Sequence, residues 1–81
     1  METAITDAAD QLLIQCRAKG WTVSTAESCT GGMVAAALTE IAGSSDVMDR
    51  GFVTYTNESK HQMVGVPMAL FETVGAVSKE V

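Results

Sequence analysis

The residues Ser28, Cys29, Thr30, Gly31 and Gly32 form a run that combines two hydroxyls, a thiol and two glycines. Ser28 and Cys29 are candidate nucleophiles, and glycines in a tight turn leave backbone N–H groups free to point at one place. Together these features suit a site for an oxyanion or a phosphate. The alternative is a polar turn in which Thr30 caps a following helix, and the run by itself favours neither interpretation.

A second polar cluster follows further along the chain and contains Tyr55, Asn57 and Lys60. A serine, a lysine and a tyrosine can together activate a hydroxyl nucleophile, because a desolvated lysine serves as the base and a phenol relays or holds the proton. The alternative is a solvated lysine on a short helix with a tyrosine packed at its base. Taken alone, the cluster favours this alternative.

The elements that must position these clusters follow from the spacing of apolar residues. Apolar side chains over 5–16 share one helical face, which predicts a helix that ends near Lys19 with Gly20 just beyond it. Residues 21–26 are rich in β-branched and aromatic side chains and predict a strand. The other predicted elements are a helix over 31–41, a strand over 51–55, a helix from 57 to 64 and a short helix from 67 to 75.

A strand, a helix and a second strand predict a right-handed βαβ unit with parallel strands. Because parallel strands share one carboxyl edge, the two polar clusters should face each other across one crevice. Two strands are too few for an independent sheet, and Ser78 resembles the N-cap of a helix with no room to form. Residues 1–81 are therefore interpreted as the front part of one α/β domain, with α/β/α layers and a mainly parallel or mixed sheet.

Composition excludes several classes of partner. The chain has ten acidic and five dispersed basic residues and a net charge of −5, which argues against binding to nucleic acid. The longest apolar stretch is too short to span a membrane, and no secretory signal begins the sequence. Two cysteines without a dense framework fit the cytoplasm. No spacing of cysteine, histidine and carboxylate residues resembles a metal site, and no cofactor is expected.

Several blocks of the sequence, in order along the chain, resemble the CinA C-terminal domain family, whose characterised activity is nicotinamide mononucleotide deamidation. Where members of that family usually have Tyr-Ser-Asn, this chain has Tyr55, Thr56 and Asn57, so the hydroxyl of the middle residue is preserved. A glycine-rich segment that follows in family members has no counterpart here, and neither has the separate N-terminal domain of longer members. The matching blocks are residues 24–32, 51–60, 64–66 and 75–81.

The resemblance implies hydrolysis of nicotinamide mononucleotide to nicotinate mononucleotide and ammonia, without a cofactor. It implies that Ser28 attacks the carboxamide carbon and that Lys60 with Tyr55 accepts and returns the proton. Backbone N–H groups of residues 29–32 would hold the oxyanion or the substrate phosphate, and Asn57 would contribute to binding.

Three alternatives stay open from the sequence. The first is a non-catalytic module for nucleotide phosphate binding or assembly, in which no bond is cleaved. The second is an inactive fragment of the enzyme. The third is an enzyme in which Cys29 attacks and Ser28 only orients the substrate. We also expect a homo-oligomer, because a second copy would cover the exposed face of so small a sheet.

Overall fold

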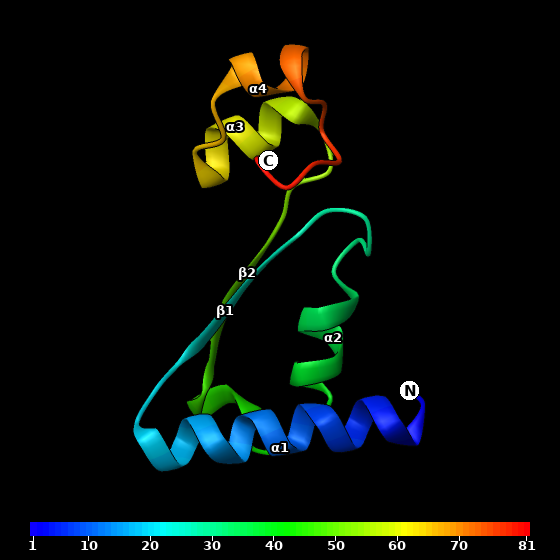
Figure 1. Ribbon diagram of the computed structural model, residues 1–81. Helices are drawn as coiled ribbons and strands as arrows, with labels where there is room; N and C mark the ends of the chain where they lie inside the picture. Colours follow the sequence, from blue (N-terminus) through cyan, green and yellow to red (C-terminus); the bar gives the residue numbers. More distant parts are fainter.

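The computed structural model describes residues 1–81 and shows a long basal helix, a pair of strands rising from it, and two short helices at the far end of the strands (Figure 1). The elements in chain order are α1 (Thr3–Lys19), β1 (Val23–Glu27), α2 (Met33–Thr39), the short 3-10 helix η1 (Ser44–Asp46), β2 (Met48–Val53), α3 (Asn57–Val64) and α4 (Met68–Thr73).

The hydrophobic core lies at the base of the molecule. The predicted first helix is confirmed as α1, which ends at Gly20 as expected and buries one face against α2 and the residues that precede β2. Leu13 is completely buried there. Such burial of apolar side chains is the main source of stability for α1. The core consists of Ala9, Leu13, Cys16, Leu38 and Val47.

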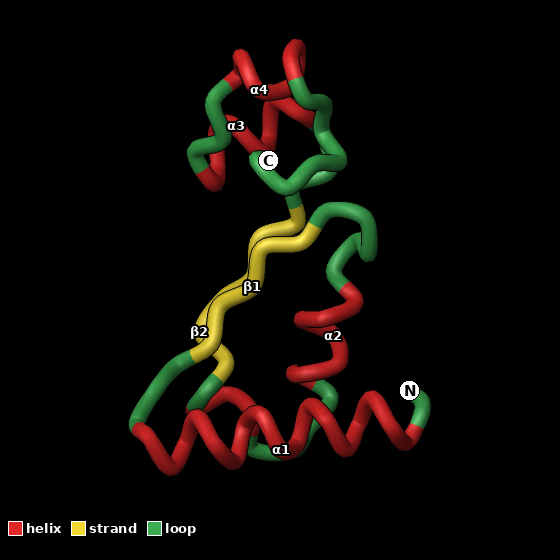
Figure 2. The backbone as a smooth tube through the Cα atoms, in the orientation of Figure 1, coloured by secondary structure: helices red, strands yellow, loops and turns green.

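The two strands pair in parallel, so the predicted βαβ unit and α/β class are confirmed (Figure 2). The register runs from the Val23–Met48 pair to the Glu27–Val53 pair. The second strand therefore occupies 48–53 and not the predicted 51–55. Its end is set by its partner, because β1 stops at Glu27 and leaves no strand for residues beyond 54 to pair with.

The helix after the first polar cluster begins later than predicted, at Met33 and not at Gly31. Gly31 and Gly32 have φ values of 67° and 105°, which lie in the left-handed region and cannot continue into a right-handed α-helix. Gly32 is the N-cap of α2, so the interpretation of Thr30 as the cap is wrong.

The far end of the molecule follows the sequence prediction closely. Thr56 caps α3 by accepting a hydrogen bond from the Ser59 amide at 3.1 Å, and the helix ends at Gly65 as predicted. The short α4 follows Pro67. After it the chain forms no helix, but the Ser78 hydroxyl accepts a hydrogen bond from the Val81 amide at 3.3 Å, as the predicted N-cap would.

The molecule is elongated, with a radius of gyration of 14.7 Å, compared with about 12 Å for a compact domain of this length. Only nine of its 81 residues are buried. An apolar groove of about 600 Å³, which we call the α1–α2 groove, is lined by side chains that include Ile5, Leu12, Met33 and Val34. None of the helices is both long enough and apolar enough to cross a membrane.

Candidate active site

A cavity of about 280 Å³ lies at the carboxyl ends of the two strands, where the sequence predicts a crevice. Its walls come from the end of β1, from α3 and from the segment that follows α4. The polar residues of the lining, with the thiol, are Glu27, Ser28, Cys29, Thr54, Lys60 and Ser78. The apolar residues of the lining are Ala26, Val64, Val66, Ala76, Val77 and Val81.

Ser28 and Lys60 are brought to the same cavity from elements far apart in the sequence. Ser28 is half-buried and directly follows β1, whereas Lys60 lies in the middle of α3 and is only 7% exposed. The Lys60 side chain makes no hydrogen bond or ion pair with any other group of the chain. A lysine that is buried to this extent without a partner is uncommon, which sets Lys60 apart from the exposed lysines of the chain.

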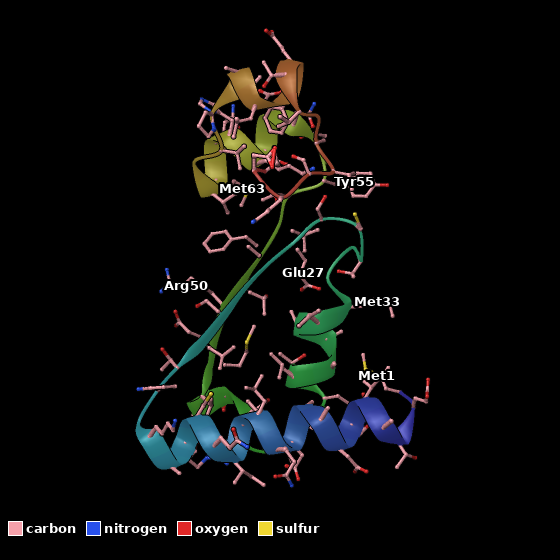
Figure 3. The ribbon with its side chains drawn as sticks, viewed as in Figure 1. Met1, Glu27, Met33, Arg50, Tyr55 and Met63 are labelled. Atoms are coloured by element: carbon pink, nitrogen blue, oxygen red, sulfur yellow. The ribbon has the colours of Figure 1, made fainter.

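Glu27, the last residue of β1, is buried and points toward the start of α2 (Figure 3). Its carboxylate accepts hydrogen bonds from the Thr30 hydroxyl at 2.7 Å, the Val34 amide at 2.6 Å and the Ala35 amide at 3.0 Å. Burial raises the pKa of this carboxyl, but the hydrogen bonds that it accepts outweigh burial and hold the pKa below its ordinary value. Glu27 is therefore a carboxylate at neutral pH.

The turn between β1 and α2 retains a few free backbone donors. The Gly31 amide donates to the Ser28 carbonyl at 3.1 Å, which closes the turn. The amides of Cys29, Thr30 and Gly32 donate to no group of the chain. An anion at this turn could therefore be held by these amides and by the equally free amide of Met33, because Glu27 already occupies the Val34 and Ala35 amides of α2.

The structure does not bring all the predicted site residues to the cavity. Ser28, Cys29 and Lys60 line it, whereas Thr30, Gly31 and Gly32, in the same turn, do not. Tyr55 is 72% exposed and points outward from the loop between β2 and α3 (Figure 3). Asn57 is exposed at the start of α3 and is also outside the lining.

Sequence reasoning missed Glu27, Thr54 and the cavity-facing position of Ser78. Thr54 is buried, and its amide donates to the Glu27 carbonyl at 2.8 Å beyond the end of the strand pair. A glutamate seven residues before the amide that it binds has no local signature, because side-chain caps act within three residues. No group of three or more histidine, cysteine or carboxylate side chains is placed to hold a metal ion.

Comparisons with known proteins agree on one family. The family model for the CinA C-terminal domain matches residues 5–81. The nicotinamide-nucleotide amidohydrolase PncC of Escherichia coli K12 is 58% identical over 65 residues, which cover 80% of this chain and 39% of that protein. The CinA-like protein of Colwellia psychrerythraea is 52% identical over 73 residues, which cover 90% of this chain and 17% of that protein.

Solved structures show the same architecture. The competence/damage inducible protein CihA from Agrobacterium tumefaciens superposes with a TM-score of 0.96 and 52% identity, over 99% of this chain and 48% of that one. A CinA superfamily protein from Escherichia coli gives a TM-score of 0.91 and 31% identity, over 100% of this chain and 48% of that one. The chain thus spans about half the length of these structures and 40% or less of these curated relatives.

Proposed function

This chain belongs to the CinA C-terminal domain family, and we propose that its cavity hydrolyses the carboxamide of nicotinamide mononucleotide to nicotinate mononucleotide and ammonia. Relatives that are 58% identical are named nicotinamide-nucleotide amidohydrolases. The observation that carries the proposal is the placement of Ser28 and the unpaired Lys60 in the wall of one cavity. A nucleophile and a base in the same cavity are what amide hydrolysis requires.

In the proposed mechanism, the Ser28 Oγ attacks the carboxamide carbon while the neutral amine of Lys60 takes the hydroxyl proton. The protonated Lys60 then gives that proton to the departing nitrogen, so that ammonia leaves and an acyl ester of Ser28 forms. Water hydrolyses the ester with Lys60 again as the base, which releases the acid and restores Ser28. Among the free amides of the turn, that of Cys29 belongs to a residue in the cavity wall and is suited to donate to the oxyanion that forms in each half of the reaction.

The size of the cavity indicates that only one part of the substrate would lie inside it. Its volume of about 280 Å³ lies just below the range of about 300–1,000 Å³ typical of complete ligand pockets. The pyridine ring would lie against apolar lining residues such as Val64, Val66 and Val77, with the carboxamide toward Ser28. The ribose phosphate would then extend out of the cavity, and the roles of Tyr55 and Asn57 stay predictions.

A non-catalytic site for a nucleotide phosphate is the competing function. Such a site would use the N-terminus of α2, but the Val34 and Ala35 amides there already donate to Glu27. A second anion would meet the negative charge of that carboxylate at close range. A pure phosphate site has no need of a base directed at a serine hydroxyl, so amide hydrolysis is the better supported proposal.

Ammonia release from nicotinamide mononucleotide tests the proposal, with the Ser28→Ala and Cys29→Ala variants compared under the same conditions. Ser28→Ala should abolish turnover and still bind the substrate, whereas Cys29→Ala should retain much of the activity. The two side chains are neighbours in the same turn, so each variant is the matched control for the other. An inactive Cys29→Ala with an active Ser28→Ala would transfer the nucleophile to the thiol, and substrate binding without any ammonia release would favour the binding module.

A further inference from the structure

One residue, Glu27, makes hydrogen bonds at both ends of the turn that carries Ser28. Glu27 is fixed through its backbone at the end of β1, where its carbonyl accepts the Thr54 amide at 2.8 Å. Its side chain reaches over the turn to the Val34 and Ala35 amides at the start of α2. The Thr30 hydroxyl, within the turn itself, donates to the same carboxylate at 2.7 Å. All three side-chain contacts are partly buried, which strengthens them.

No other side chain accepts a hydrogen bond from the amides at the start of α2. The N-cap residue of α2 is Gly32, which has no side chain to accept a helix amide. Gly31 and Gly32 both adopt positive φ, and glycines lose more conformational freedom on ordering than any other residue. Without the carboxylate, the only hydrogen bond that closes the turn would be the one from the Gly31 amide to the Ser28 carbonyl.

We propose that Glu27 is a positioning residue for Ser28, because its carboxylate ties α2 to the end of β1 and so holds the intervening turn in the conformation that places Ser28 in the wall of the cavity. The part of this inference that concerns turnover rests on the proposed amide hydrolysis. The part that concerns the turn does not. Glu27 acts through the turn and takes no part in proton transfer in this assignment.

The Glu27→Gln variant tests the role in the turn. Glutamine has the same length, but it offers one acceptor oxygen and places an NH₂ group against an amide donor. Hydrogen exchange of the Gly31 amide, followed by NMR, should become at least about tenfold faster, which corresponds to loss of one charge-assisted hydrogen bond. The Leu13 amide in α1 reports whether the core stays folded. Glu72→Gln is the matched control, because Glu72 is exposed on α4 and makes no side-chain hydrogen bond.

An unchanged Gly31 exchange rate in Glu27→Gln would overturn the proposal. If that variant also unfolds the core, the pair Thr30→Val and Thr30→Ser decides the question, because both keep the carboxylate. Loss of the hydroxyl in Thr30→Val should accelerate Gly31 exchange, and Thr30→Ser should restore the original rate. Equal exchange in the two Thr30 variants and the unmodified chain would then overturn the proposal.

Turnover supplies the second measurement. In Glu27→Gln, kcat for ammonia release should fall by about 10- to 100-fold with little change in KM, because a displaced nucleophile impairs the chemical step more than binding. A purely structural role would lower the melting temperature and leave kcat of the folded protein unchanged, which would overturn the positioning of Ser28. If the unmodified chain released no ammonia, the proposed function would fail, and the exchange rates would still decide whether Glu27 holds the turn.

Discussion

Replacing Lys60 with methionine should make the protein more stable and abolish ammonia release. Lys60 is 7% exposed, and its ammonium group has no hydrogen bond or ion pair within the chain. Methionine keeps an unbranched side chain of similar length and removes the charge. A residue retained at a cost in stability is expected where a reaction requires it, and the proposed amide hydrolysis requires a base for Ser28.

The size of the stability gain follows from the burial of Lys60. Replacing buried charged residues by apolar residues of similar volume has ranged from neutral to a gain of about 1–4 kcal/mol. Lys60 lines an open cavity and is not enclosed in the core, so the lower part of this range applies. A gain of about 1 kcal/mol in the free energy of unfolding would raise the melting temperature of a domain of this size by about 4–8 °C.

Thermal unfolding followed by circular dichroism, together with the ammonia assay, checks both halves of this prediction. Lys79→Met is the matched control, because Lys79 is exposed and its loss should change stability by less than about 0.5 kcal/mol. Lys60→Arg should be nearly inactive as well, since a guanidinium keeps its proton and cannot act as the base. It should show no gain in stability, because the positive charge in the cavity wall remains.

Two results would refute the reasoning about Lys60. A lower melting temperature in Lys60→Met than in the unmodified chain would show that the ammonium contributes favourable contacts. Turnover by Lys60→Arg at close to the original rate would reduce Lys60 to a positive charge that anchors the substrate phosphate. In that case the base would have to be sought elsewhere in the cavity.

Two further predictions concern residues outside the cavity. If Tyr55 relays the proton as the sequence predicts, Tyr55→Phe should lower kcat by about a hundredfold, and an unchanged kcat would leave Ser28 and Lys60 to carry the reaction. The chain should also self-associate in sedimentation velocity, because the α1–α2 groove and both edges of the two-stranded sheet are uncovered. A monomer with a cooperative thermal transition would contradict this second prediction.

The sequence predicted those elements whose signals are local. The first helix follows from its apolar face, and α3 follows from Thr56 at its start and Gly65 at its end. The parallel pairing of the strands follows from the connecting helix. These features depend on neighbouring residues and on general rules of chain connection, so a single sequence contains them.

The details that the sequence did not predict depend on contacts between distant residues. The limits of β2 depend on where β1 ends, and residues 54 and 55 look as suitable for a strand as those before them. The start of α2 depends on the φ values of Gly31 and Gly32, which the residue type permits but does not determine. The exposure of Tyr55 follows from the same early end of the strand pair.

The core and the cavity lie at opposite ends of the strand pair, and this separation explains what holds the site together. Figure 2 shows α1 at one end of the strands and α3 at the other. Apolar burial is concentrated around Leu13 at the base and does not extend to the carboxyl ends of the strands. There the chain is held by polar contacts, namely the Thr54 amide on the Glu27 carbonyl and the three donors on the Glu27 carboxylate. Polar contacts are directional, so they fix the orientation of a turn more narrowly than apolar packing does. The site geometry therefore depends more on Glu27 than on the hydrophobic core.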